Sequence, residues 1–246
     1  MFIDSHCHIE EEAKSYVENA VNNNVKIMIN AATDLESSKK AIDLARMYPG
    51  VFACIGVHPE EVKDFNFDMK PFEEMVNDKK VVAIGEIGLD YYYEKDTRDL
   101  QIKVFREFLS LAQRFNLPVV IHSRNATDDT LRILKEYKVK GVIHCFSGSI
   151  ETAREYIKLG FVLGIGGVVT FKNSKLIDVI REIPLEYIVL ETDSPYLSPE
   201  PFRGTINESK NIVTIANFLS EHLSKNIDEI REKTTSNVLR IFDKIG

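Results

Sequence analysis

The chain has 246 residues, of which 44% are hydrophobic and 28% charged, and it carries a formal net charge of −7. This composition is that of a soluble globular protein, and no apolar run approaches the roughly 20 residues that a membrane-spanning helix needs. The negative charge argues against a protein that coats nucleic acid through a broad basic surface, although an enzyme that grips a few phosphates in a cleft needs only local positive charge.

The three cysteines, Cys7, Cys54 and Cys145, are odd in number and have no regular spacing. We therefore expect reduced thiols and neither a disulfide framework nor a cysteine-based zinc site. The first residues include Asp4 and His6, where a signal peptide would have a basic segment followed by an apolar one. Both observations predict a cytoplasmic protein.

Short apolar runs rich in β-branched residues recur along the whole chain, and charged stretches separate them. The runs are Phe2–Ile3, Val25–Ile29, Val51–Val57, Val81–Ile84, Leu117–Ile121, Val142–Ile143, Phe161–Ile165 and Tyr187–Leu190. Between the fourth and fifth runs, apolar residues from Leu100 to Phe115 repeat every three or four positions, which is the spacing of one helix face. Continuous apolar strands that alternate with amphipathic helices indicate βαβ units around a parallel sheet.

Eight such units in about 250 residues match the size of a (β/α)8 TIM barrel. The main alternative is a doubly wound open sheet, which typically carries a Gly-x-Gly-x-x-Gly turn after its first strand. His6-Cys7-His8 stands at that place, and no linker or repeat of fixed period divides the chain. We therefore predict an α/β fold, a single TIM-barrel domain over residues 1–246.

Helix signals fit this arrangement. Asp34 precedes a predicted helix that ends at Met47, and Thr97 stands where it would cap the helix that follows the fourth run. The segment Ile227–Ile245 predicts a last amphipathic helix that closes the barrel, and Ser194–Gly204 predicts a long loop after the last strand.

Histidines and acids gather at the carboxyl ends of the runs. Only one of the six histidines, His222, lies elsewhere. The side chains at these ends are His6, His8, His58, Glu86, His122, His144 and Asp193. Alternate residues of a strand point to one side, so His6 and His8 can face one target while Cys7 faces away. All strand ends of a barrel open on one face, where the active sites of this fold lie.

Imidazole and carboxylate ligands without a thiolate suit zinc, manganese, iron or magnesium. Four imidazoles and two carboxylates exceed what one tetrahedral catalytic ion needs. We therefore predict a centre that holds two divalent metal ions.

Five segments resemble the signature blocks of the TatD family of metal-dependent deoxyribonucleases, and they occur in the family's order from residue 4 to about residue 208. The segments are Asp4-Ser5-His6-Cys7-His8, Gly56-Val57-His58-Pro59, Gly85-Glu86-Ile87-Gly88-Leu89-Asp90, Ile143-His144-Cys145-Phe146-Ser147-Gly148 and Glu191-Thr192-Asp193-Ser194-Pro195-Tyr196-Leu197. The resemblance implies a TIM-barrel hydrolase with a centre of two divalent ions (Mg, Mn or Zn). It also implies cleavage of DNA phosphodiester bonds, often as a 3′–5′ exonuclease.

The resemblance further implies a role for each ligand. The implied ligands are His6, His8 and Asp193 for the first metal, Glu86 for the bridge, and His122 and His144 for the second metal. A metal-activated water would be the nucleophile, and Asp193 would deprotonate it, orient it or serve as a simple ligand. Asp193 and Glu86 are thus the predicted catalytic acids.

Other side chains are candidates for substrate contact. Arg124 either reaches a phosphate or forms a surface ion pair, and His58 either contacts substrate or orients a metal ligand. Tyr91-Tyr92-Tyr93 offers rings on which a base can stack, but packing of these rings against the barrel is the favoured interpretation.

Arg203 is a further candidate, because the loop after the last strand is where barrels often bind phosphate. The alternative is an ion pair with Glu208 that shapes the loop. The family usually has Arg-Gly-Lys-x-Asn-Glu-Pro there, whereas this chain has Arg203-Gly204-Thr205-Ile206-Asn207-Glu208-Ser209. The loss of the lysine and the proline leaves the contacts of this loop with substrate open.

Two other classes of function compete with a nuclease. Ester or amide hydrolases of the amidohydrolase type, including aminoacyl-tRNA deacylases, share the His-x-His start, but many of them bridge their metals through a carbamylated lysine where this chain has Glu86. A non-catalytic binding protein on a barrel scaffold predicts the loss of ligands, yet every expected ligand is present. We expect nucleic acid as the substrate, and neither a membrane nor an obligate protein partner.

Overall fold

The strands of the computed structural model, which describes residues 1–9, 13–93 and 95–245, form one parallel sheet whose order follows the chain from β1 to β8. They are β1 (Phe2–Cys7), β2 (Val25–Ala31), β3 (Val51–Ile55), β4 (Val81–Asp90), β5 (Val119–Arg124), β6 (Gly141–Ile143), β7 (Phe161–Ile165) and β8 (Ile188–Leu190). At the carboxyl ends of β1 and β8, the Asp193 amide donates to the His6 carbonyl oxygen over 3.0 Å, and the His8 amide donates to the Ser194 carbonyl oxygen over 2.7 Å. The predicted TIM barrel is confirmed.

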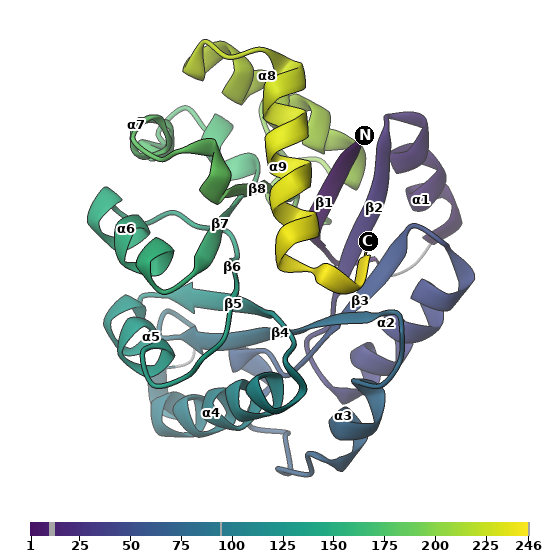
Figure 1. Ribbon diagram of the computed structural model, residues 1–246, viewed down its shortest axis with the longest axis vertical. Helices are drawn as coiled ribbons and strands as arrows, with labels where there is room; N and C mark the ends of the chain where they lie inside the picture. The colour runs from purple at the N-terminus through teal and green to yellow at the C-terminus, as the bar shows by residue number, and fades with distance from the viewer. Residues whose placement is uncertain (10–12, 94, 246) are drawn as a thin grey trace.

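Helices alternate with the strands and surround them (Figure 1). They are α1 (Ala13–Asn22), α2 (Leu35–Met47), α3 (Lys70–Met75), α4 (Arg98–Phe115), α5 (Thr127–Leu134), α6 (Ile150–Lys158), α7 (Leu176–Arg181), α8 (Ile212–Leu223) and α9 (Ile227–Ile241). Within the described ranges, no helix has the length and apolar character that crossing a bilayer requires.

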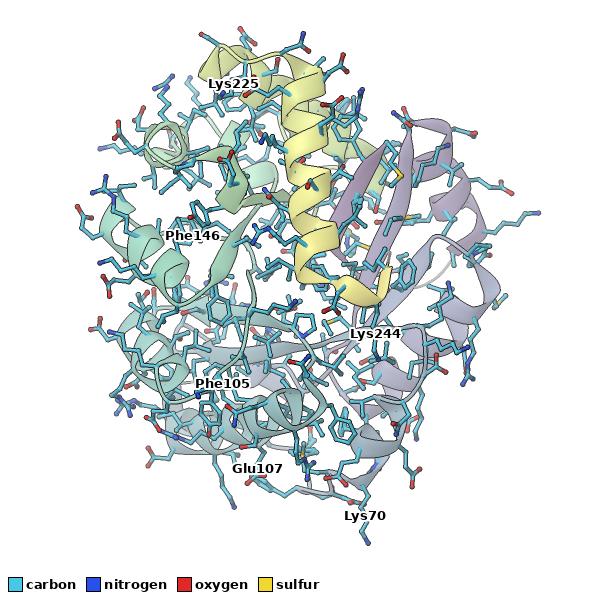
Figure 2. The ribbon with its side chains drawn as sticks, in the orientation of Figure 1. Lys70, Phe105, Glu107, Phe146, Lys225 and Lys244 are labelled. Carbon is cyan, nitrogen blue, oxygen red and sulfur yellow. The ribbon has the colours of Figure 1, made fainter. Side chains whose placement is uncertain are left out.

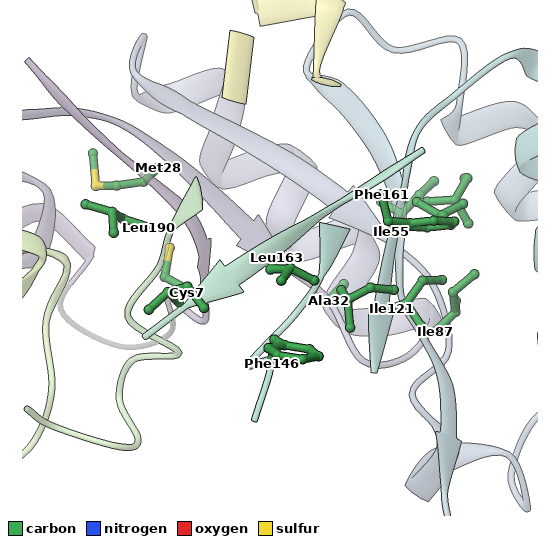
Figure 3. Packing of buried hydrophobic residues seen from close by; sticks show 14 of the residues in the cluster. Cys7, Met28, Ala32, Ile55, Ile87, Ile121, Phe146, Phe161, Leu163 and Leu190 are labelled. Atoms are coloured by element: carbon green, nitrogen blue, oxygen red, sulfur yellow. The ribbon is translucent and has the colours of Figure 1, made fainter. Parts of the chain in front are cut away.

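The apolar side chains form two buried layers. The larger one lies between strands and helices and includes Cys7, Ile87 and Ile121, which Figure 3 shows among their neighbours. Phe105 and Phe146 of the same layer lie inside the molecule in Figure 2. Because each strand is covered on its outer face and packed on its inner face, the apolar runs are nearly continuous in sequence.

The second layer fills the barrel interior, where Val238, Ile241 and Phe242 pack on strand residues such as Ile3 and Val82. These strand residues lie at the amino-terminal ends of their strands, so the end of α9 closes that end of the barrel. Figure 1 shows α9, in yellow, running between β8 and β1. The predicted closing helix is confirmed, although it ends at Ile241 and a short 3-10 helix over Asp243–Ile245 follows it. The opposite end is left for the functional site.

Two local predictions are wrong in detail. The fourth strand continues to Asp90 instead of ending at Glu86, because the residues after Glu86 still pair with β5. Thr97 stands at the N-cap position of α4 but makes no capping hydrogen bond, and its hydroxyl accepts from the Gln101 side chain over 3.0 Å. The predicted helix after Asp34 is confirmed as α2, and the Asp34 side chain caps it by accepting from the Ser37 amide.

Candidate metal centre

All six side chains predicted to hold metal lie together at the carboxyl ends of the strands. Glu86 is at their centre, since its carboxylate oxygens lie between 2.9 and 3.8 Å from the ring nitrogens of five histidines. The rings belong to His6, His8, His58, His122 and His144. His222, the histidine that the sequence set apart, stacks on Phe218 of α8 instead.

The first two histidines face the cluster as the alternation of β1 predicts. The Nε2 atoms of His6 and His8 lie 3.2 Å apart. Cys7 points the other way, and its thiol donates to the Ile29 carbonyl oxygen over 3.5 Å. The Nδ1 atom of His8 lies 2.9 Å from the carbonyl oxygen of Ala31, which only accepts, so the neutral ring carries its proton on Nδ1 and its lone pair on Nε2.

An irregularity in β4 aims Glu86 into the barrel. Between Ile84 and Ile87 the strand advances three residues while β5 advances two, from Val119 to Ile121. An extra residue of this kind changes the direction in which neighbouring side chains point. Glu86 Oε2 then lies 3.3 Å from His6 Nε2, and Oε1 lies 2.9 Å from His122 Nδ1. The two oxygens of one carboxylate thus face different histidines.

Asp193 reaches the same cluster from the end of β8. Its Oδ1 lies 3.5 Å from His8 Nε2, 3.7 Å from His6 Nε2 and 3.8 Å from His144 Nε2. The backbone at Asp193 is left-handed, with φ of 55°, a conformation that aspartate tolerates better than most residues. This turn directs the carboxylate back over the strand ends.

A buried carboxylate behind the sheet holds Asp193 in place. Asp4 accepts from the Thr192 amide over 3.0 Å and from the Thr192 hydroxyl over 2.6 Å. Asp4 also accepts from the Ser209 hydroxyl over 2.6 Å. Ser209 stands where the family pattern has proline. Complete burial raises the pKa of Asp4 to about 7, although these hydrogen bonds favour the ionised form. In the altered loop, the serine that stands in place of the proline therefore donates a hydrogen bond to Asp4, the residue that fixes Thr192.

Two further carboxylates orient histidines of the cluster. Asp90 Oδ2 lies 3.0 Å from His122 Nε2, and Glu191 Oε1 lies 3.0 Å from His144 Nδ1, so the other nitrogen of each ring faces Glu86. Both carboxylates are fully buried. Neither of them was predicted to have a role from the sequence. The even spacings from Glu86 to Asp90 and from Glu191 to Asp193 are a weak signal in the sequence, because such spacings keep side chains on one face of a regular strand. The contacts themselves depend on how β4 pairs with β5 and on the turn that follows β8.

Replacing Asp90 with asparagine is expected to weaken metal binding or activity by about 10- to 100-fold, the usual effect of removing a carboxylate that orients a ligating histidine. The amide would donate to His122 Nε2 and favour the wrong tautomer. Metal dissociation constants measured by calorimetry test this, with Asp178→Asn, an exposed aspartate paired with Arg181, as the control. Equal affinities in the two variants would contradict an orienting role.

The charges of the cluster shift the pKa of its members in opposite directions. Burial alone would raise the pKa of Glu86, but the surrounding histidines, His144 and His58 first, hold it well below its usual value. Burial alone would lower the pKa of His144, but Glu191 and Glu86 raise it to about 10. Burial, and then the nearby His144, lower the pKa of His6. The cluster therefore places ionised carboxylates among imidazoles.

The donor chemistry fits divalent metal ions. His6, His8 and Asp193 bring one ligand atom each to within 4.8 Å of one another, as do His6, Glu86 and His144, and also His58, Glu86 and His122. The first group is the set predicted for one metal. His122 and His144 share Glu86 but fall in different groups, and His58 stands beside His122, with its Nε2 3.5 Å from Glu86 Oε1.

A cavity of about 580 Å³ opens above the cluster. It is lined by His8, Thr33, His58, Glu60, Glu61, Glu86, Tyr93, His122, Arg124, His144, Asp193, Tyr196 and Leu197. Two of the predicted substrate contacts, His58 and Arg124, thus lie in the cavity wall. In the described part of the chain Arg124 forms no ion pair, and its guanidinium carbon lies 4.2 Å from the ring centre of Tyr92 and 4.6 Å from that of Tyr93.

Arg203 does not line the cavity. Its guanidinium carbon lies 3.8 Å from the ring centre of Phe171, and the alternative pairing with Glu208 is replaced by a Lys210–Glu208 ion pair.

The favoured packing of the three tyrosines is wrong for two of them. Tyr92 and Tyr93 are 53% and 61% exposed, whereas the hydroxyl of the half-buried Tyr91 donates to Asp129 Oδ2 over 2.7 Å.

Comparisons with known proteins identify the family of the chain. The sequence model of the family described as TatD related DNase matches residues 3–243. The metal-dependent hydrolase YabD of Bacillus subtilis is 39% identical over 252 residues, which cover 98% of this chain and 99% of YabD. The crystal structure of YjjV, a TatD homolog from Escherichia coli K12, superposes with a TM-score of 0.93 at 31% identity and covers 98% of each chain. That of a TatD-family hydrolase from Entamoeba histolytica gives 0.85 at 26% identity, covering 98% of this chain and 97% of the other. The chain belongs to the TatD family of metal-dependent hydrolases.

Proposed function

We propose that the protein is a deoxyribonuclease that hydrolyses DNA phosphodiester bonds at a centre of two divalent metal ions (Mg, Mn or Zn), removing nucleotides from the 3′ end. The observation that carries this proposal is Glu86, whose two carboxylate oxygens face different histidines at the floor of the cavity. A glutamate stands at this place, where many amidohydrolases have a carbamylated lysine, and this favours a nuclease over the amidohydrolase alternative. The description of the matching family, TatD related DNase, supports the same substrate.

Each side chain of the cluster has a proposed role. His6, His8 and Asp193 would hold one ion, Glu86 would bridge, and His122 and His144 would hold the second, with His58 beside them. Bound ions would lower the pKa of water and offset the charge that develops on the phosphate.

Asp193 accepts the proton of the attacking water. The histidines around its carboxylate, His144 first, outweigh its burial and hold its pKa below the usual value, so it is ionised at neutral pH. Arg124, in the cavity wall, attracts the phosphate. These two residues give the site a base and a cation of its own.

Metal binding is expected to release at least about two protons at pH 7, because at least two of the proposed ligands, His122 and His144, are protonated in the metal-free protein. Although burial opposes it, neighbouring carboxylates raise the pKa of His122 to about 9 and that of His144 to about 10. Apparent metal affinity should therefore rise with pH, by about tenfold per unit for each displaced proton, until pH approaches these values. Calorimetry in buffers of different ionisation enthalpy measures the release, and a pH-independent affinity between pH 6 and 8 would contradict it.

The substrate is tested by adding Mn²⁺, Mg²⁺ or Zn²⁺ to metal-stripped protein and assaying single-stranded DNA beside ester, amide and aminoacyl-tRNA substrates. We expect metal-dependent shortening of the DNA from its 3′ end and no comparable cleavage of the other substrates. Metal-dependent ester or amide cleavage without phosphodiester cleavage would overturn the proposal in favour of the amidohydrolase alternative.

We further propose that the working unit is one domain over residues 1–246 that acts in the cytoplasm without an obligate protein partner. Cys7, Cys54 and Cys145 are free thiols, which suits a reducing compartment.

A further inference from the structure

The turn after β4 presents aromatic surface to solvent at the edge of the metal cavity. Tyr93 lines the cavity and is 61% exposed, and Tyr92 beside it is 53% exposed. Their ring centres lie 4.7 Å apart with the planes nearly perpendicular. Large aromatic rings are normally buried, and a pair left exposed beside a catalytic cavity is typical of a binding surface.

Hydrogen bonds hold this turn in one conformation. Asp90 Oδ1 accepts from the amides of Tyr92 and Tyr93 over 2.8 and 2.9 Å. The Tyr91 amide donates to the Arg124 carbonyl oxygen over 2.9 Å. The other oxygen of Asp90 faces His122, so one buried carboxylate holds both the backbone that carries the exposed rings and a histidine of the metal cluster. The rings are therefore preorganised at a set position relative to the reacting centre.

Arg124 gives the same wall its charge. Its guanidinium group lies over both rings, an arrangement that holds the side chain without neutralising it. The cavity wall also contains Glu60 and Glu61, which repel phosphate. A nucleotide chain that leaves the metal centre is thus favoured toward Arg124 and the tyrosines and disfavoured toward the two glutamates.

We propose that Tyr93, supported by Tyr92 and Arg124, is a stacking platform for the base next to the reacting phosphodiester, so that the enzyme positions unpaired nucleotides. The proposal rests on the nuclease function proposed above. Tyrosine suits this role, because its flat face accepts any base, and stacking of this kind is sequence-tolerant. The three residues are positioning residues, since the chemistry takes place at the metal cluster.

The test compares two single-stranded oligonucleotides that differ only at one nucleotide beside the 3′-terminal bond. One strand carries a base at that nucleotide, and the other carries an abasic tetrahydrofuran residue. The comparison is made twice, once for the nucleotide on each side of the bond. The metal-loaded wild-type protein should prefer the strand with the base in kcat/KM by about 5- to 100-fold, mainly through KM. Tyr93→Leu should reduce this preference to near one, and Tyr93→Phe, which keeps the ring, should retain it.

The matched control is Phe115→Leu. Phe115 is 39% exposed at the end of α4, with the Arg114 guanidinium carbon 5.5 Å from its ring centre, and it does not line the cavity. This variant should keep the wild-type preference. If Tyr93→Leu also keeps it, the platform is refuted.

A second measurement separates this proposal from the nuclease function itself. Fluorescence anisotropy with phosphorothioate-linked strands, which resist cleavage, gives the same base-to-abasic ratio as a ratio of binding constants. A wild-type protein that binds the strand with the base more tightly but cleaves no phosphodiester would refute the nuclease and keep the platform. Equal binding of the two strands, together with normal cleavage, would refute the platform and keep the nuclease.

Discussion

Replacing Glu86 with glutamine is expected to lower phosphodiester hydrolysis by more than about 10³-fold. Bound metal ions would supply several kcal/mol of transition-state stabilisation, and each 1.36 kcal/mol is a factor of ten in rate. Glutamine keeps the size of the side chain but loses the negative charge that faces His6 and His122 from the two oxygens. We therefore expect the variant to lose metal together with activity.

The measurement is kcat/KM on single-stranded DNA together with the metal content of the purified protein. Glu136→Gln is the control, because it makes the same change at a surface carboxylate that pairs with Arg106. Unfolding in urea shows whether the barrel of the Glu86 variant remains intact. A Glu86→Gln protein with full activity and full metal content would refute the bridging assignment.

Replacing Asp193 with asparagine is expected to lower the rate by about 10²- to 10⁴-fold, the range typical of the loss of a general base. Asparagine occupies the same space beside His6 and His8 but accepts no proton from water. If Asp193 acts as both a ligand and a base, metal affinity and kcat both fall, and kcat stays low at saturating metal. If it acts as a ligand alone, metal affinity falls, and saturating metal restores the rate.

The Asp193 experiment therefore measures kcat at several metal concentrations. Asp243→Asn, which removes an exposed carboxylate paired with Lys140, is the control. An Asp193→Asn protein with wild-type kcat at every metal concentration would exclude both roles.

The barrel and the position of its active face were predictable, because they depend on regular patterns. The apolar runs mark the strands, and His6, His58, His122 and His144 follow four of them at equivalent places. Parallel strands bring such places together without any knowledge of loop structure.

The details of β4 were not predictable from the same patterns. Gly85 and Glu86 interrupt an apolar run, which indicates the end of a strand, whereas pairing with β5 continues the strand to Asp90. The extra residue that aims Glu86 inward depends on this pairing, and so does the contact of Asp90 with His122. Contacts between neighbouring strands set these features, and local sequence does not encode them.

The tyrosines show the same limit at a single turn. Tyr91, Tyr92 and Tyr93 are identical in type, yet one is held by Asp129 of α5 while the other two lie exposed against Arg124. Their different surroundings come from residues more than 30 positions away in the chain. Propensity alone therefore could not separate the ring that packs from the rings that face the cavity.

Divalent metals held around Glu86 are proposed to drive the cleavage of DNA. The most direct measurement titrates metal-stripped protein with Mn²⁺ and follows the rate of shortening of an end-labelled single strand. We predict no cleavage without metal and a rate that rises until two equivalents per chain are bound. Full cleavage in the presence of a chelator, or metal binding at two equivalents without any cleavage of DNA, would contradict the claim.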